Sequence, residues 1–203
     1  MSEGFWLLRD CLKEGEVTPA DCAATGPRNE PNTTWPGAEY GVPAQLARGM
    51  AQDLVGARPL KVGPTVIHRA ANDPPRGWHR DWPFWNNAHA LDEMPPQLGV
   101  LFYPIGGTIA LIPNAHLRWC EIDDELIAAV GRCAPQVPMV EYRELESEKR
   151  VYNGPRDVLL LDGRLPHAVP ADPRDRPAMN VWCWFFDHLN EPMNRDHSIL
   201  RGR

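Results

Sequence analysis

The chain has 203 residues, of which 43% are hydrophobic and 24% charged, so it has the composition of a globular protein and is long enough to bury a core. Its net charge of −6, without a run of Lys or Arg, argues against a nucleic-acid partner. No apolar stretch approaches the ~20 residues that a membrane helix needs, so we expect no membrane-spanning segment.

The N-terminal sequence and the cysteines favour a cytoplasmic protein. The first residues include Glu3 and Asp10 and lack the basic region of a signal peptide. The five cysteines are Cys11, Cys22, Cys120, Cys133 and Cys183. Because their number is odd and no two lie close in sequence, we expect reduced thiols and no disulfide framework.

The N-terminal part of the chain is predicted to lie outside the main core. We expect a short helix within residues 1–14 and an irregular stretch over 15–42, where Pro, Gly and Asn recur. Residues 1–42 would thus form an irregular arm, which is a candidate lid. The first clear helix is expected at 43–55, because Pro43 suits a first turn and apolar residues recur at helical spacing.

Short strands are predicted for most of the remaining chain. The sequence contains 22 prolines, roughly twice the usual ~5% share, which argues against long helices over much of it. A second helix is expected at 122–130, where Ile and Leu recur at helical spacing. The expected strands are 64–69, 77–82, 98–103, 107–112, 137–142, 157–162 and 178–186.

The pattern of these strands predicts a fold class. Many short strands separated by Pro and Gly turns indicate a mainly β protein, a double-stranded β-helix of jelly-roll or cupin type with a few flanking helices. Both helices are expected on the outside of one sheet. We expect residues 1–203 to form a single domain with its barrel core at 60–187.

A pair of residues two apart, His79 and Asp81, carries the clearest chemistry, together with His167 far downstream. On an extended strand, residues i and i+2 point the same way, so both side chains can reach one ion while Arg80 faces away. The third ligand, His167, must come from a strand brought alongside. Two imidazoles and one carboxylate are the ligand set that holds non-haem Fe(II) and leaves the opposite face open.

Other interpretations of this pair exist. A His-x-Asp pair alone is a weak signal, because it is often a surface pair or a hydrogen-bonded core histidine. The same ligand types also hold Zn²⁺, although no separate carboxylate is placed by spacing as the general base of a zinc hydrolase.

Four blocks of sequence, in order, resemble the phytanoyl-CoA dioxygenase-like branch of the Fe(II)/2-oxoglutarate-dependent oxygenases. The blocks are 79–85, 107–116, 156–167 and 178–186. The first is similar to the metal-binding strand of that branch, and the third to the strand that leads to its distal histidine. The second departs from the pattern, since Asn114 and Ala115 replace Gly and Ser before His116, which we therefore interpret as structural.

The resemblance implies Fe(II) held by His79, Asp81 and His167, with 2-oxoglutarate as co-substrate and O₂ as oxidant. Succinate and CO₂ would be released while a small molecule is oxidised, most simply by hydroxylation, as in secondary metabolism. Asp81 argues against halogenation, because the halogenases of this superfamily replace this carboxylate with a small residue. Desaturation, ring formation and epimerisation stay open.

The expected anchor for the far carboxylate of 2-oxoglutarate departs from the family. Ala178 occupies the position where an arginine is common, and Arg176 and Arg174 precede it with the same strand parity. Arg176 is the candidate, because a guanidinium binds a carboxylate through its planar fork. The alternative is that both arginines lie on a solvated turn. Other candidate groups for the co-substrate are Thr108, Tyr103, Arg69 and Lys61.

Aromatic residues beside the metal motif are candidates for substrate binding. We predict that Trp82, Asn87 and Trp182 contact the substrate, although core packing is the commoner role of a tryptophan. Residues 83–97 and 187–203 are candidate lids, and the latter is also a candidate dimer contact.

Two further functions compete with an oxygenase. One is a cupin-type metalloenzyme that does not use 2-oxoglutarate, which the alanine at 178 supports. The other is a non-catalytic barrel that binds a small molecule, against which the intact ligand set argues. In each case we expect a small-molecule partner and a monomer or homodimer.

Overall fold

The structure, a computed structural model, describes residues 2–22, 42–82, 94–129 and 138–185. Its elements are β1 (Phe5–Leu8), α1 (Val42–Val55), β2 (Lys61–Arg69), β3 (Arg76–His79), β4 (Gln97–Phe102), β5 (Gly107–Leu111), the 3₁₀ turn η1 (Ala115–Leu117), α2 (Asp123–Ala129), β6 (Lys149–Asn153), β7 (Val158–Asp162), β8 (His167–Val169) and β9 (Arg176–Trp184).

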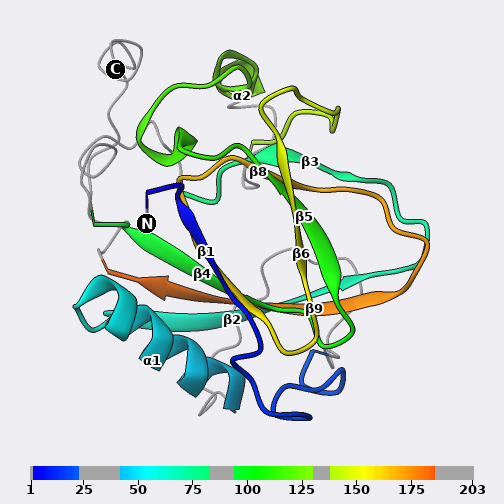
Figure 1. Ribbon diagram of the computed structural model, residues 1–203. Helices are drawn as coiled ribbons and strands as arrows, with labels where there is room; N and C mark the ends of the chain where they lie inside the picture. The colour runs from blue at the N-terminus through cyan, green and yellow to red at the C-terminus, as the bar shows by residue number, and fades with distance from the viewer. Residues whose placement is uncertain (1, 23–41, 83–93, 130–137, 186–203) are drawn as a thin grey trace.

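The strands form two antiparallel sheets that face each other (Figure 1). One sheet has the order β1-β7-β4-β9-β2 and the other the order β3-β8-β5-β6. Neighbours in each sheet are far apart in sequence, which is typical of a jelly roll. The predicted mainly β, double-sheet fold is therefore confirmed, although no strand pairing among the described residues closes the two sheets into a continuous barrel.

The faces of the central strand β9 show how the core is divided. Met179, Val181 and Cys183 point to the outer face, where they join a cluster with small residues of α1. The helix presents Ala44, Ala47 and Ala51 to this cluster, so its backbone lies close to the sheet (Figure 1). The alternate residues of β9 therefore face the second sheet.

The sequence had suggested that both helices lie on the outside of one sheet, but in the structure they do not. α1 covers β2, β4 and β9, whereas Leu126 of α2 packs in the other cluster with Ile109 and Leu111 of β5. α2 therefore belongs with the four-stranded sheet (Figure 1). None of the helices in the described residues is long and apolar enough to cross a membrane.

The predictions for the N-terminus were wrong. Residues 5–8 form a strand in place of a helix, and β1 pairs with β7 at the edge of the five-stranded sheet. The apolar run Phe5-Trp6-Leu7-Leu8 is too short for its pattern to separate a helix from a strand. Part of the expected arm is therefore built into the sheet, outside the predicted core limits of 60–187. Residues 23–41, the rest of that arm, lie outside the described part.

Several strand limits also differ from the prediction. The expected strand at 77–82 ends at His79, and the expected strand at 137–142 is reduced, within its described residues, to one bridge between Val140 and Trp78. Besides β1, two strands were not predicted, β6 and β8. β6 begins with exposed Lys149 and Arg150 and buries only Val151 and Asn153, and β8 has only three residues.

Candidate metal centre

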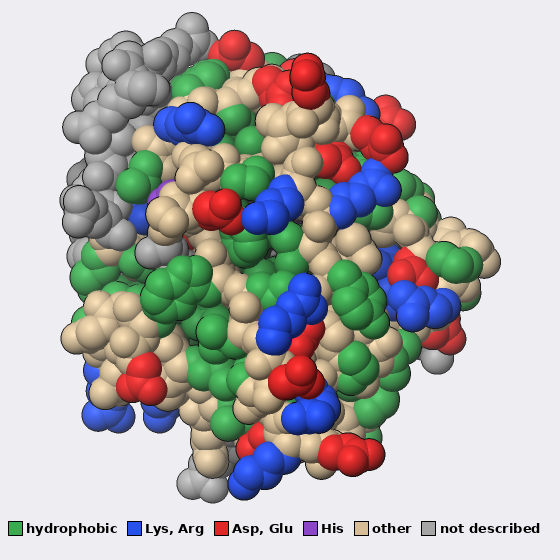
Figure 2. Space-filling model, in the orientation of Figure 1, with side chains coloured by type: hydrophobic (Ala, Val, Ile, Leu, Met, Phe, Trp, Pro, Cys, Tyr) green, Lys and Arg blue, Asp and Glu red, His purple; other side chains and the backbone are tan. Residues whose placement is uncertain are grey.

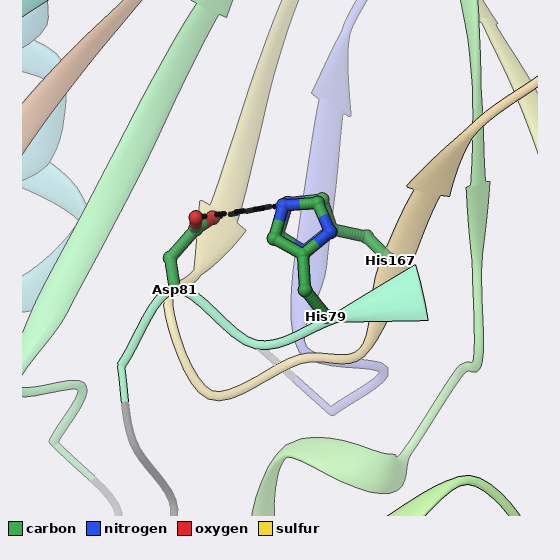
Figure 3. A group of neighbouring side chains, drawn as sticks. All are labelled: His79, Asp81 and His167. Carbon is green, nitrogen blue, oxygen red and sulfur yellow. Dashed lines mark ion pairs between the residues drawn. The ribbon is translucent and has the colours of Figure 1, made fainter. Parts of the chain in front are cut away.

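The three predicted ligands come together between the sheets. His79 is the last residue of β3, His167 is the first residue of β8, and the two are direct partners in the antiparallel pairing. Cross-strand partners project on the same side of a sheet, which explains why the two imidazole centroids lie only 4.2 Å apart. Asp81 follows two residues after β3 and points its carboxylate toward the rings (Figure 3).

Backbone carbonyls fix which nitrogen of each histidine faces inward. His79 Nδ1 lies 2.8 Å from the carbonyl of Gly77, and His167 Nδ1 lies 3.0 Å from the carbonyl of Leu165. Because a carbonyl only accepts hydrogen bonds, each Nδ1 is assigned the proton. In a neutral ring with this tautomer, Nε2 carries the lone pair that a metal requires.

The carboxylate of Asp81 completes a donor set that suits a cation. Its two oxygens lie 3.0 Å from His167 Nε2 and 3.7 Å from His79 Nε2. One donor atom from each of the three residues lies within 4.8 Å of the others. These contacts are attractive only when a proton or a metal ion lies between carboxylate and imidazole. Two imidazoles and a carboxylate fit Fe(II), and the residues present are therefore a suitable site for it.

The environment favours the ligand forms of His79 and Asp81. Burial, reinforced by the nearby charges of His167 and Arg76, lowers the pKa of His79 well below its usual value, which favours the neutral ring. Burial alone would raise the pKa of Asp81, but its interactions with His167, and then with His79 and Arg76, outweigh burial and lower that pKa to about 2. Asp81 is therefore ionised at neutral pH.

Arg80, between two of the ligands, turns to the other side, as predicted. Its Nε and one terminal nitrogen donate to the two carboxylate oxygens of Asp123, at 2.8 and 2.6 Å. Both residues are almost fully buried, with 2% and 0% of their surface exposed. The other terminal nitrogen donates to the carbonyls of Ala115, at 2.8 Å, and Arg164. This bidentate pair thus anchors the segment that carries Asp81.

The loop before His167 holds both ligand segments through three successive carbonyls. The carbonyl of Gly163 accepts the Trp82 backbone N–H at 2.8 Å, that of Arg164 accepts the guanidinium of Arg80, and that of Leu165 accepts His167 Nδ1–H. The residues on either side of Asp81 are therefore bound to the loop that presents the distal histidine.

A second buried ion pair shapes this loop. The guanidinium of Arg164 donates to both carboxylate oxygens of Asp162, at 3.0 and 2.8 Å, and its backbone N–H donates to one of them at 2.9 Å. Neither side chain is more than 1% exposed. Neither this pair nor Arg80–Asp123 was predicted. Asp162 and Arg164 are close in sequence, but nothing local in the sequence connects Arg80 with Asp123.

The candidate co-substrate residues lie in different places. Arg176 is the first residue of β9 and only 3% exposed; it shares a strand face with Ala178, and it donates to the Pro170 carbonyl at 3.0 Å. Arg174 is exposed and pairs with Asp172, so the solvated-turn alternative holds for Arg174 and not for Arg176.

Tyr103 and Thr108 differ in orientation. Tyr103 is buried in the cluster that also contains Ala178, and it packs against Gly107 so closely that an added Cβ there would lie 2.3 Å from its ring. Thr108 pairs with the exposed Tyr152. Because Leu111, the partner of His167, is an odd number of residues away, Thr108 faces the opposite side of β5. The structure does not bring Thr108 to the metal site.

Two of the candidate substrate residues lie beside the metal ligands. Trp82 and Trp182 form a buried cluster with Trp184 between the sheets. Asn180 lies on the same face of β9, 3% exposed, and its Oδ1 has no hydrogen-bond partner in the described part of the chain. Room for these groups comes from Gly99, where an added Cβ would lie 2.9 Å from both Asn180 and Trp182. Asn87, the third candidate, lies outside the described residues.

Comparison with solved structures shows the same fold in non-haem 2-oxoglutarate enzymes. EctD from S. alaskensis, solved with 2-oxoglutarate and 5-hydroxyectoine, is 17% identical with a TM-score of 0.58, over 98% of this chain and 80% of that one. EvdO2 from Micromonospora carbonacea var. aurantiaca is 16% identical with a TM-score of 0.57, over 98% and 93% of the two chains. The epimerase SnoN from nogalamycin biosynthesis is 16% identical with a TM-score of 0.52, over 90% and 79%.

Sequence comparison gives no such likeness. No family model matches the chain, and no curated protein matches it. At these low identities the structural comparison defines the fold, a jelly roll that is also used by iron- and 2-oxoglutarate-dependent enzymes, whereas the function has to be argued from the site.

The buried ion pair leads to a stability prediction. Asp123→Ala leaves the guanidinium of Arg80 buried without its carboxylate, so we expect the free energy of unfolding to fall by ~3–5 kcal/mol in urea titrations. The matched control is Glu125→Ala in the same helix, which removes an exposed pair with Arg143 and should cost less than ~1 kcal/mol. Equal losses in both variants would contradict the anchoring role of Asp123.

Proposed function

We propose that this protein is an Fe(II)- and 2-oxoglutarate-dependent oxygenase that oxidises a small molecule. The observation that carries the proposal is the group of His79, Asp81 and His167 inside a jelly roll, with both Nδ1 atoms directed at backbone carbonyls and both Nε2 atoms facing the carboxylate of Asp81. Enzymes of the same fold have been solved with Fe³⁺ and α-ketoglutarate, as in SnoN, and with 2-oxoglutarate, as in EvdO2.

Each residue of the site has a defined task in this proposal. His79 and His167 would hold the metal through Nε2, and Asp81 would hold it through its carboxylate. Bound iron and 2-oxoglutarate would supply the oxygen-dependent oxidation, with succinate and CO₂ as the products of the co-substrate. The chain itself binds, orients and shields the reactants. Burial of both histidines, at 1% and 5% exposure, keeps bulk water from these ligands.

Arg176 is proposed to bind the far carboxylate of the co-substrate. It replaces the arginine that the family carries at the position of Ala178, two residues later on the same face of β9. Its Nε is buried and has no hydrogen-bond partner in the described residues, so it retains a donor for a ligand. Tyr103 is proposed to line the same region, since it packs in the cluster that includes Ala178. The buried position of Arg176 argues against a cupin-type enzyme that dispenses with 2-oxoglutarate.

The tryptophans Trp82 and Trp182 are proposed to form an apolar wall for the substrate. They lie between the sheets next to the segment that carries Asp81, and indole rings suit an apolar or planar molecule. The carboxylate of Asp81 favours hydroxylation or a related oxidation over halogenation. The phytanoyl-CoA dioxygenase-like branch is the proposed affiliation within the class.

Anaerobic absorption spectroscopy tests the proposed cofactors. Metal-free protein titrated with Fe(II) and then 2-oxoglutarate should develop a visible iron-to-ketoacid charge-transfer band. Asp81→Ala should weaken Fe(II) binding at least about tenfold, because it removes the anionic member of the His79, Asp81 and His167 group. The control is Glu144→Ala, an exposed carboxylate on the surface. Absence of the band in the wild type at saturating Fe(II) and 2-oxoglutarate would contradict the proposal.

The anchor is tested by a pair of neighbouring arginines. Arg176→Gln should weaken 2-oxoglutarate binding to the Fe(II) protein at least about tenfold, since a buried ion pair would lose its cation. Arg174→Gln removes the same charge two residues away, from an exposed side chain, and should leave the affinity within about twofold. Both are measured by anaerobic titration of the charge-transfer band. Equal effects would instead point to a general loss of positive charge.

A further inference from the structure

A β-bulge in β3 changes which residue shares the face of His79. His79 pairs with His167 and Arg76 pairs with Val169, so three residue steps on β3 match two on β8. Because β3 has one extra residue between these two pairs, Arg76 projects on the same side of the sheet as His79, although the two are three residues apart. Without the bulge, that side would be occupied by Gly77. β-Bulges are frequent next to active sites, where they redirect a side chain in this way.

Arg76 has no ion-pair partner in the part of the chain that the structure describes. Its side chain is partly buried, its Nε is shielded from solvent without a hydrogen-bond partner, and no carboxylate of the described residues forms an ion pair with it. The other arginines at the site differ sharply: Arg80 and Arg164 are each held by both oxygens of a buried carboxylate. A guanidinium that is shielded and unpaired is costly unless a ligand supplies the negative charge.

A second arginine approaches the same end of β8 from the facing sheet. Arg176 donates to the carbonyl of Pro170, the residue after the partner of Arg76. The carboxylate of Asp172 lies 3.7 Å from Arg176 and is already bound by two nitrogens of exposed Arg174, at 3.1 and 3.0 Å. Arg176 therefore shares this carboxylate with another arginine.

Arg76 lies close to the candidate metal ligands. Arg76 and His79 pair with Val169 and His167, which are two residues apart on β8 and project on the same side of the sheet. An anion bound at Arg76 would thus lie within electrostatic range of the metal, on the side of the sheet where the ligands project.

We propose that Arg76 is a second carboxylate-binding residue of this site, separate from Arg176. The proposal rests on the proposed function for the position of the metal and of 2-oxoglutarate. A guanidinium presents parallel N–H donors that match a carboxylate, and Nε is one of the donors left open here. The carboxylate belongs either to the far end of 2-oxoglutarate, shared with Arg176, or to an acidic substrate. Both sources present the same chemical group, an organic carboxylate beside the metal ligands.

A stability measurement separates a ligand-binding arginine from a structural one. Arg76→Gln should leave the melting temperature unchanged or raise it, because no described carboxylate loses its partner. Arg80→Gln, which strands the carboxylate of Asp123, should lower it. If Arg76→Gln destabilises the protein as much as Arg80→Gln, Arg76 is structural and the proposal is wrong.

Binding to Ni(II)-loaded protein, followed by calorimetry, identifies the source of the carboxylate. The probes are 2-oxoglutarate, its analogue 2-oxopentanoate, which lacks the far carboxylate, and benzoate added after 2-oxoglutarate. If Arg76→Gln weakens 2-oxoglutarate at least about tenfold but leaves 2-oxopentanoate unchanged, the far carboxylate is the ligand. If only benzoate is weakened, the ligand is an acidic substrate.

Controls keep this result apart from the proposed function. Arg174→Gln should behave as the wild type with every probe. If the affinities of Arg76→Gln for all three probes equal those of the wild type, the proposal is overturned, whether or not the enzyme uses 2-oxoglutarate. If wild-type protein binds no Ni(II), the proposed function fails. Benzoate binding to the metal-free wild type and to metal-free Arg76→Gln then decides the role of Arg76. At least about tenfold weaker binding by the variant supports a carboxylate-binding role, and equal or undetectable binding rejects that role.

Discussion

The candidate ligand Asp81 lies on a segment that is no longer paired as a strand, so its position depends on the buried guanidinium of Arg80. That side chain binds Asp123 on one side and the carbonyl of Arg164 on the other. Because the carbonyls of Gly163 and Leu165 bind Trp82 and His167, one short loop sets the relation between the two ligand segments. The same contacts leave both Nε2 atoms facing the carboxylate. The positions of the candidate metal ligands thus depend on the ion pair and the hydrogen bonds made by the residues next to them.

The jelly roll supplies the rest of the site through simple alternation. On β9, one face packs beneath α1 and the other carries Arg176, Asn180 and Trp182 toward the opposite sheet. The candidate metal ligands from one sheet therefore meet polar and aromatic groups from the other. The buried arginines Arg80 and Arg164 are paired with carboxylates, whereas the Nε atoms of Arg76 and Arg176 have no hydrogen-bond partner among the described residues. On the surface, by contrast, acidic and basic side chains are interspersed over the face shown in Figure 2.

The fold class, and the three residues that come together as a candidate metal site, could be predicted from the sequence, because both depend on local patterns: short apolar strands between prolines, and ligand types at strand spacing. The partner of Arg80 could not be predicted, since Asp123 is brought near only by the fold. The outward orientation of Thr108 follows from the register of β5 against β8, which no single segment encodes. β1 was mistaken for a helix because four apolar residues have no clear period, and β6 was missed because its charged residues resemble a loop.

We infer that one metal ion is bound by His79, Asp81 and His167, with both histidines using Nε2. Anomalous diffraction at the iron edge, from crystals grown anaerobically with Fe(II), would locate this ion. We expect one peak in contact with both Nε2 atoms and a carboxylate oxygen of Asp81, with the Nδ1 atoms still bound to the carbonyls of Gly77 and Leu165. A peak coordinated through Nδ1, or bound away from these three residues, would contradict it.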